Sequence, residues 1–235
     1  MMSKNYTVIA AGGLGKRLQN FRENDATKML LQINGESMIT HQLNQLLSWG
    51  LDNFIIITNP NYDYLIKEEV IKNFQNENIQ FVMQEKQLGV AHALLQAEMK
   101  IEEGSNLFYI LGDNFFEKNP LKGMNYLTSS PTAFLMEVDN PEEFGVVELK
   151  NESIVSVEEK PKNPKSNTIA VGLYYFDSKC FEYIKLIKQS SRGEYEITSL
   201  LEQYIKNNQL SYSMINGWWI DAGTPEAVEL YESLV

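Results

Sequence analysis

Short apolar runs alternate with helical hydrophobic periods in the first half of the chain, and this alternation limits the fold more than any other feature. Buried strands are predicted at Tyr6 to Ala11, Asn53 to Thr58, Ile79 to Gln84 and Asn106 to Leu111. The residues between them predict helices that end near Gly50, run from Tyr62 to Phe74 and run from Val90 to Ile101. Consecutive β-α-β units build a mostly parallel sheet with helices on both faces. We therefore predict a three-layer, Rossmann-like α/β fold with a mixed, mostly parallel sheet.

The second half has a different pattern, because Pro, Asn and Gly turns separate its strand-like runs. Mixed or antiparallel additions to the sheet are expected at Thr132 to Val138, Gly145 to Leu149, Ile154 to Val157 and Ala170 to Phe176. Helices are predicted over Ser178 to Lys188 and over Glu196 to Asn207. A chain of 235 residues is long for one α/β domain but short for two, and no linker or repeat divides it. We predict a single domain over residues 1–235.

The first strand runs directly into a glycine-rich turn with cations, GGLGKRL at residues 12–18. Glycine allows backbone N–H groups to approach an anion, and Lys16 and Arg17 add positive charge. A dinucleotide fingerprint would need glycine at Leu18, and a P-loop would need glycine at Ala10 and Ser or Thr at Arg17. Both known motifs fail. The pattern predicts a nucleotide phosphate site of another kind, with an ordinary tight turn as the alternative interpretation.

Charge and cysteine content exclude several classes of function. The formal net charge of −11 disfavours nucleic acid and anionic membranes as partners. It makes a divalent metal bridging carboxylates and phosphates plausible. The one cysteine, Cys180, forms no internal disulfide, and neither a signal peptide nor a membrane-spanning apolar run is recognisable. We therefore predict a cytoplasmic protein.

Spaced motifs over nearly the whole chain, from about residue 6 to about residue 230, point to one family. They are AGGLGKRL, Lys28, MQEKQLGVAHAL, LGDN, EEFGVVE, EEKPKNPKS, VGLYYFD, RGEYEIT and WWIDAGT. Together and in this order they resemble the sugar-nucleotidyltransferases, most closely the glucose-1-phosphate thymidylyltransferase family. The resemblance implies an enzyme that transfers a nucleoside monophosphate from dTTP or UTP to a hexose 1-phosphate such as glucose 1-phosphate, releasing pyrophosphate. It also implies Mg²⁺ as cofactor, and a homo-oligomer is compatible with it.

The resemblance assigns roles to the residues that match the family's motifs. The catalytic residues would be Arg17, Lys28 and Lys160. The nucleotide would be bound, within about residues 1–115, by Ala11, Gly12, Gly13, Gly15, Gln84, Gly89 and Asp113. The sugar phosphate would be bound, within about residues 116–235, by Gly145, Glu159, Lys160 and Gly172. The Mg²⁺ ligands would be Asp113 and Asp221.

Outside the family context, each of these residues has a plainer interpretation. Asp113 and Asp221 would be turn residues, Arg17 and Lys28 solvated charges, and the sequence around Glu159 a charged surface turn.

The implied reaction fits the chemistry of these residue types. The second pKa of a phosphate monoester is about 6, so a sugar 1-phosphate is already an anionic nucleophile and needs no strong general base. Two unit negative charges about 4 Å apart repel by about 4 kcal/mol at an effective dielectric of 20, and cations must offset this before in-line attack. Catalysis would therefore depend on electrostatics and positioning.

Several features leave alternatives open. Thr27, Met29, Gln32 and the pair Asn20-Phe21 depart from the family pattern, so part of the contact network differs. Cytidylyl transfer, or a non-hexose acceptor such as phosphocholine, is the runner-up. A binding-only homologue and a nicotinamide-dependent oxidoreductase are further alternatives. Because the sequence stops where longer members add C-terminal helices, no feedback site is expected.

Four further side chains have simpler expected roles. His41 and His92, without partner histidines or cysteines, are expected to pack or to lie at the surface. Trp218 and Trp219 alternate along a strand, so at most one should face the site.

Overall fold

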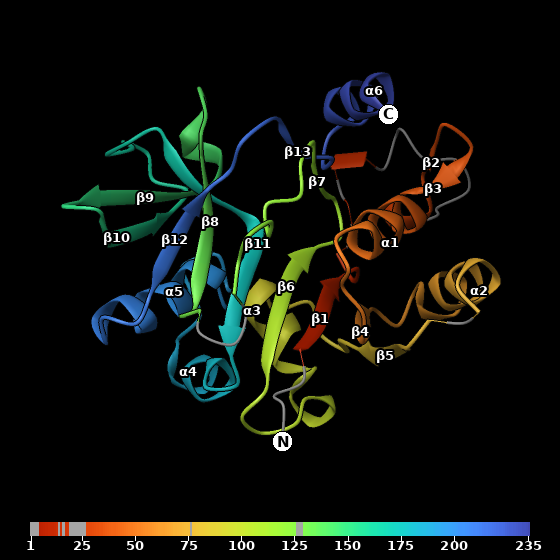
Figure 1. Ribbon diagram of the computed structural model, residues 1–235, viewed down its shortest axis with the longest axis horizontal. Coiled ribbons are helices and arrows are strands. Elements are labelled where there is room, and N and C mark those ends of the chain that lie inside the picture. Colours follow the sequence, from red (N-terminus) through yellow and green to blue (C-terminus); the bar gives the residue numbers. More distant parts are fainter. Residues whose placement is uncertain (1–4, 14, 16, 19–26, 76, 126–128) are drawn as a thin grey trace.

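The computed structural model describes residues 5–13, 15, 17–18, 27–75, 77–125 and 129–235. Its main sheet has the strand order β10-β9-β11-β6-β1-β4-β5 (Figure 1). The parallel part consists of β1 (Asn5–Ala10), β4 (Phe54–Thr58), β5 (Ile79–Met83) and β6 (Asn106–Leu111). Val8 of β1 lies opposite both Ile55 and Tyr109, and all three side chains are buried. The predicted parallel half of the sheet is confirmed.

The antiparallel part begins at β11 (Thr168–Asp177), which pairs with β6. The same strand also pairs with β8 (Thr132–Glu137) and β9 (Gly145–Lys150). An irregularity between Ala170 and Tyr174 separates its two stretches of pairing with β8. Beyond these strands lie β10 (Ser153–Glu159) and β12 (Ser211–Met214). The sheet is mixed, as predicted.

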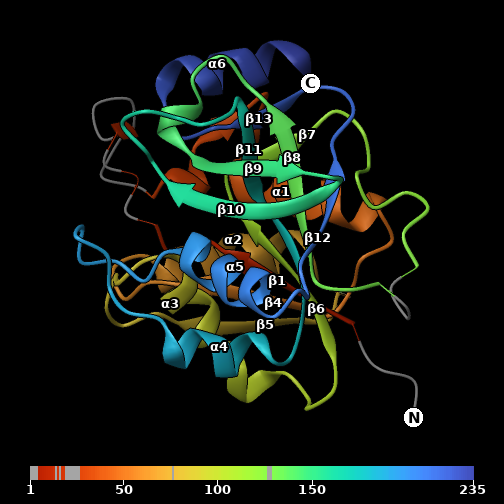
Figure 2. The same cartoon turned by 90° about the vertical axis from the view of Figure 1, so that its left-hand side faces the viewer.

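Helices cover both faces of the sheet and create two separate cores. On one face α1 (Met38–Ser48) and α2 (Asp63–Asn73) pack on residues such as Ile9 and Ile56. On the other face α3 (Val90–Leu95), α4 (Cys180–Leu186) and α5 (Ile197–Lys206) pack on residues such as Val8 and Ile57 (Figure 2). Alternating β1 residues thus face opposite cores, as the pleat requires. The predicted three-layer α/β fold is confirmed.

One predicted helix is shorter than its hydrophobic period. The period from Val90 to Ile101 predicts a continuous helix, but α3 ends at Leu95 and a 3-10 turn, η3 (Glu98–Lys100), follows. The Gln96 side chain donates to the His92 carbonyl at 3.0 Å, while the Gln96 backbone N–H bonds Ala93. The side chain thereby occupies the carbonyl that a continuing α-helix would use.

Several short elements have too few residues to show a period. They are β2 (Gln32–Ile33), β3 (Glu36–Ser37), β7 (Asn114–Phe116), β13 (Trp219–Asp221), η2 (Lys28–Leu30) and η4 (Pro141–Glu143). The C-terminal helix α6 (Pro225–Leu234) was also not predicted, although Thr224 caps it and Pro225 occupies its first turn. The pairing of β13 with β7 places Asp221 opposite Asn114.

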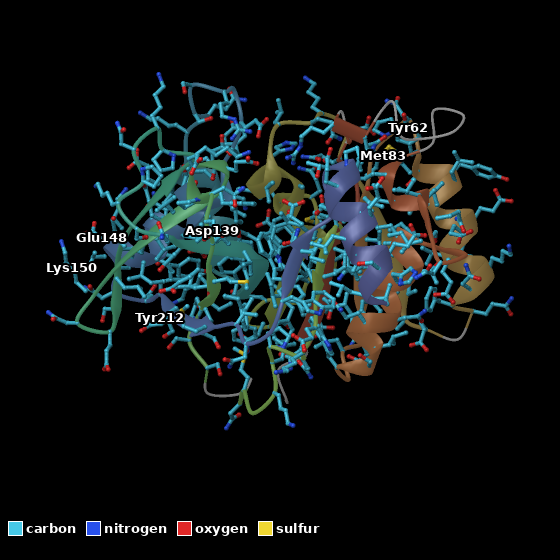
Figure 3. The ribbon with its side chains drawn as sticks, turned by 90° about the horizontal axis from the view of Figure 1, so that it is seen from above. Tyr62, Met83, Asp139, Glu148, Lys150 and Tyr212 are labelled. Carbon is cyan, nitrogen blue, oxygen red and sulfur yellow. The ribbon has the colours of Figure 1, made fainter. Side chains whose placement is uncertain are left out.

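The edge strands β5 and β10 lie toward opposite ends of the molecule, and the C-terminal helix α6 returns to the first half of the chain, where Tyr231 packs edge-on against His41 (Figure 1). Seen from above, Tyr62 and Met83 lie toward one end, and Glu148 and Lys150 lie at the other (Figure 3). Among the described residues, no helix combines the length and the apolar character needed to cross a bilayer.

Candidate functional site

A cavity of about 470 Å³ opens where β1, β5 and β6 end. Both halves of the chain contribute to its wall, since Gly12 and Gln84 come from the first half and Glu159 and Asp221 from the second. The predicted site residues that line it are Gly12, Gly13, Gly15, Arg17, Lys28, Gln84, Gly89, Asp113, Gly145, Glu159, Lys160, Gly172 and Asp221. Ala11 does not line it, because this residue is fully buried in the core beside the turn.

The glycine turn lies close to neighbouring backbone. A Cβ on Gly12 would come within 2.9 Å of the Thr58 carbonyl oxygen, and the Asn59 side chain donates to the Gly12 carbonyl at 2.8 Å. The Lys28 side chain passes over the turn, with its Nζ 3.8 Å from where a Gly13 Cβ would lie. The turn and a cation therefore share one wall. Lys16 and the Asn20-Phe21 pair lie outside the described residues.

Asp113 follows β6 and forms a buried ion pair with Lys28. Burial would raise the pKa of Asp113, but the charge and hydrogen bond of Lys28 outweigh it and hold the pKa below its usual value. This carboxylate is therefore ionised, and an ammonium group stands beside it in the cavity wall.

Asp221 lies beside this pair, because β13 pairs with β7 and the Ala222 N–H donates to the Asp113 carbonyl at 2.8 Å. Burial, together with the charge of Asp113, raises the pKa of Asp221 to about 7. Its Oδ1 is sealed from solvent and accepts no hydrogen bond from the described residues. Arg17 approaches the same place, since a Cβ on Gly223 would lie 2.8 Å from Asp221 Oδ1 and 2.9 Å from Arg17 Nη2.

This carboxylate pair suits a hard divalent cation. Two repelling carboxylates and a buried oxygen without a donor are the arrangement that a cation would relieve. Within the part of the chain that the structure describes, no three His, Cys, Asp or Glu side chains gather as a metal cage. Two carboxylates are enough for Mg²⁺, which is usually held by one or two of them together with water and substrate phosphates.

The predicted base-binding residues lie where β5 ends and α3 begins. The Gln84 amide nitrogen donates to the Gly89 carbonyl at 3.2 Å and lies 2.9 Å from His92 Nδ1. Gly89 has a φ of 103°, and a Cβ there would come within 2.7 Å of the Tyr195 carbonyl oxygen. His92, expected to pack or to lie at the surface, is in direct contact with a predicted site residue.

The predicted sugar-phosphate residues line the second half of the cavity. Glu159 accepts hydrogen bonds from Thr198 Oγ1 at 3.1 Å and Arg192 Nη1 at 3.3 Å. Burial raises the pKa of Glu159 above its usual value, and the charge of Glu196 adds to this effect. Gly145 leaves room for Thr198, whose Cγ2 would be 2.6 Å from a Cβ at that position. Lys160, at a φ of 44°, follows Glu159 into the same wall.

Asn114 joins three elements at the floor of the cavity. Its Oδ1 accepts from the Gly172 N–H at 3.0 Å and from Trp219 Nε1 at 2.8 Å. Trp219 lines the cavity, whereas Trp218 packs edge-on against Tyr231, as their alternation along a strand predicts.

Other lining residues were not singled out from the sequence; they include Asn114, Phe144, Arg192, Glu196 and Thr198. The motif RGEYEIT was the available signal for three of them. His41 lies outside the cavity, with its Nε2 2.8 Å from the Ile33 carbonyl oxygen.

The whole cavity wall falls inside one family match. The model of the family described as nucleotidyl transferase matches residues 6–232. The chain belongs to this family. A glucose-1-phosphate thymidylyltransferase of Neisseria meningitidis is 34% identical to it over 236 residues, covering 97% of this chain and 81% of the relative. The resemblance inferred from the motifs is confirmed, and the chain is that of a nucleotidyltransferase.

Two further proteins are similar to this chain over nearly its full length. The UTP–glucose-1-phosphate uridylyltransferase AglF of Haloferax volcanii is 31% identical, covering 93% of this chain and 91% of the relative. A Bacillus anthracis crystal structure, provisionally described as a glucose-1-phosphate thymidylyltransferase in complex with a sucrose, superposes with a TM-score of 0.86. It is 33% identical and the match covers 98% of this chain and 95% of that one.

Proposed function

We propose that this protein transfers a nucleoside monophosphate from dTTP or UTP to a hexose 1-phosphate such as glucose 1-phosphate, giving the nucleoside-diphosphate sugar and pyrophosphate. The observation that carries the proposal is that one cavity combines the glycine turn, the predicted cations Arg17, Lys28 and Lys160 and the predicted carboxylates Asp113 and Asp221 with the predicted sugar residues. In this proposal residues of about 1–115 bind the nucleotide and residues of about 116–235 bind the sugar phosphate, within one domain.

Each side chain has a binding or catalytic role that follows from its position in the cavity. The glycine turn and Arg17 hold the triphosphate and stabilise the charge that develops on pyrophosphate. Lys28 contacts the reacting phosphates, and Lys160 holds the sugar 1-phosphate in line with the α-phosphorus. Glu159 accepts hydrogen bonds from sugar hydroxyls. No residue is required as a strong base, because the attacking phosphate is already an anion.

Asp113 and Asp221 would hold Mg²⁺ in this scheme. When bound, the ion supplies positive charge that offsets the repulsion between the two phosphate substrates. A cytoplasmic location and a homo-oligomeric state remain predictions that accompany this proposal.

The direct test is pyrophosphate release with Mg²⁺ across a grid of nucleotides and acceptors. The nucleotides are dTTP, UTP, CTP, GTP and ATP, and the acceptors are glucose 1-phosphate, N-acetylglucosamine 1-phosphate and phosphocholine. We expect turnover with dTTP or UTP and a hexose 1-phosphate, and its loss when EDTA removes the metal. Turnover confined to CTP or to phosphocholine would overturn the proposed substrates while leaving nucleotidyl transfer intact. Absence of pyrophosphate release with every nucleotide and acceptor pair would favour a protein that binds these ligands without turning them over.

Replacing Gln84 by alanine tests the predicted base site. The change removes the buried amide at the end of β5 and should raise the KM for the nucleoside triphosphate about three- to tenfold, the usual value of one hydrogen bond. The kcat should change little, because the base is held equally in the ground and transition states. Gln80→Ala is the matched control, since Gln80 lies on the same strand but does not line the cavity. Equal kinetics in the two variants would refute the role of Gln84.

A further inference from the structure

The orientation of the Gln84 amide is determined by its two neighbours. Its Nε2 lies 3.2 Å from the Gly89 carbonyl oxygen, a group that only accepts hydrogen bonds. Turning the amide over would set its oxygen against this carbonyl. The same Nε2 lies 2.9 Å from His92 Nδ1. Both amide hydrogens are therefore engaged, whereas the amide oxygen accepts no hydrogen bond from any described residue.

His92 can accept the hydrogen bond from the Gln84 amide only when its ring is neutral. Two amide nitrogens approach the ring: Gln84 Nε2 lies 2.9 Å from Nδ1, and Gln96 Nε2 lies 3.4 Å from Nε2. The shorter contact decides the tautomer, so Nδ1 accepts from Gln84 and the ring proton lies on Nε2. An imidazolium would set an N–H donor against an NH₂ donor. Burial lowers the pKa of His92 below its usual value, which favours the neutral ring.

The surroundings of His92 keep the ring in place. Tyr195 stacks on it, with ring centroids 6.0 Å apart and planes 24° apart. Gln96, which follows the last residue of α3, donates to the His92 carbonyl at 3.0 Å. The Tyr195 backbone is in turn bonded to α3 and its preceding loop through Ala91 N at 3.0 Å and Leu88 O at 2.7 Å.

We propose that His92 is a positioning residue: it holds the Gln84 amide with its nitrogen turned to the protein and its oxygen offered to the bound base. The base subsite then selects a pyrimidine that carries a ring N–H. Uracil and thymine have this donor at N3, whereas cytosine has a lone pair there that would face the amide oxygen. A freely rotating glutamine amide would serve either kind of base, so discrimination depends on the histidine. This inference rests on the proposed function, because it takes the cavity side of Gln84 as the base site.

The test compares kcat/KM for dTTP, UTP and CTP with one sugar 1-phosphate. The wild type should prefer dTTP or UTP over CTP. His92→Ala should reduce this preference about three- to tenfold, as expected for one lost hydrogen bond. His92→Asn should restore it, because the asparagine oxygen takes the place of Nδ1. Gln80→Ala is the control: Gln80 lies on β5 and outside the cavity wall, so its loss should leave the preference unchanged. If the alanine variant unfolds, His92→Leu fills most of the ring volume without an acceptor and carries the same expectation.

The outcomes separate the two proposals. A merely structural role of His92 would lower kcat/KM for every nucleotide equally, and an unchanged preference in an active His92→Ala variant would overturn the positioning role alone. A wild type that prefers CTP would overturn the orientation of the amide. Absence of turnover with any pyrimidine nucleotide in the wild type would remove the proposed function itself.

Discussion

Replacing Asp113 by asparagine should lower kcat by about three orders of magnitude and leave the protein folded. Removing one preorganised charged group from a site of this kind typically costs 10²- to 10³-fold, and Asp113 combines two such roles. It is a predicted metal ligand, and it is also the partner of Lys28. Asparagine keeps the shape and one oxygen, but it removes the charge that attracts a cation.

The fold should tolerate this change for a local reason. Burial raises the pKa of Asp221, and the charge of Asp113 raises it further. Neutralising Asp113 removes this second, repulsive contribution while Asp221 remains near Lys28. Steady-state pyrophosphate release measures kcat, and a melting curve measures the fold. Asp139→Asn is the control, because Asp139 is exposed and does not line the cavity. Turnover within a few-fold of wild type would contradict the role of Asp113.

Gly89→Ala should destabilise the protein and weaken nucleotide binding together. At a φ of 103° an alanine is strained, and its Cβ would lie 2.7 Å from the Tyr195 carbonyl oxygen and 2.8 Å from the Tyr195 nitrogen. Strain of this kind costs about 1–2 kcal/mol and overpacking about 1–3 kcal/mol, so the free energy of unfolding should fall by about 2–5 kcal/mol. Relief of the clash would move the Gly89 carbonyl away from Gln84 and raise the KM for the nucleotide.

Gly104→Ala separates the cost of backbone strain from the cost of overpacking. Gly104 has a φ of 78°, but no atom lies within 4 Å of a Cβ built there. This variant should lose about 1–2 kcal/mol from backbone strain alone and keep the wild-type KM. Urea unfolding and nucleotide kinetics on both variants provide the comparison. An equal loss of stability in the two variants would show that the close approach of Tyr195 to Gly89 has no energetic consequence.

The sequence predicts what depends on local periodicity. The strands β1, β4, β5 and β6 are short and predominantly apolar, and α1 shows apolar residues at helical spacing, so their positions follow from the order of residues. The parallel pairing then follows from the connections between them. The glycine turn and the LGDN aspartate consequently lie at one edge of the sheet, which is where the cavity is found.

The sequence does not predict contacts whose partners are far apart or whose elements are short. Asp221 comes to Asp113 only because β13 pairs with β7, and three-residue strands have no readable period. His92 looks like an ordinary helical residue until α3 is placed against the end of β5.

The sequence by itself therefore determined the layered α/β fold, the family and a set of residues that come together in the cavity wall. The tertiary structure alone decided which of these side chains meet, how each amide and carboxylate is oriented, and which oxygen is left without a donor. The physical reason is that periodicity reflects burial, a property of one residue and its near neighbours. Hydrogen bonds and ion pairs such as Lys28 with Asp113 depend instead on ångström-scale distances between segments that only the packed chain brings together.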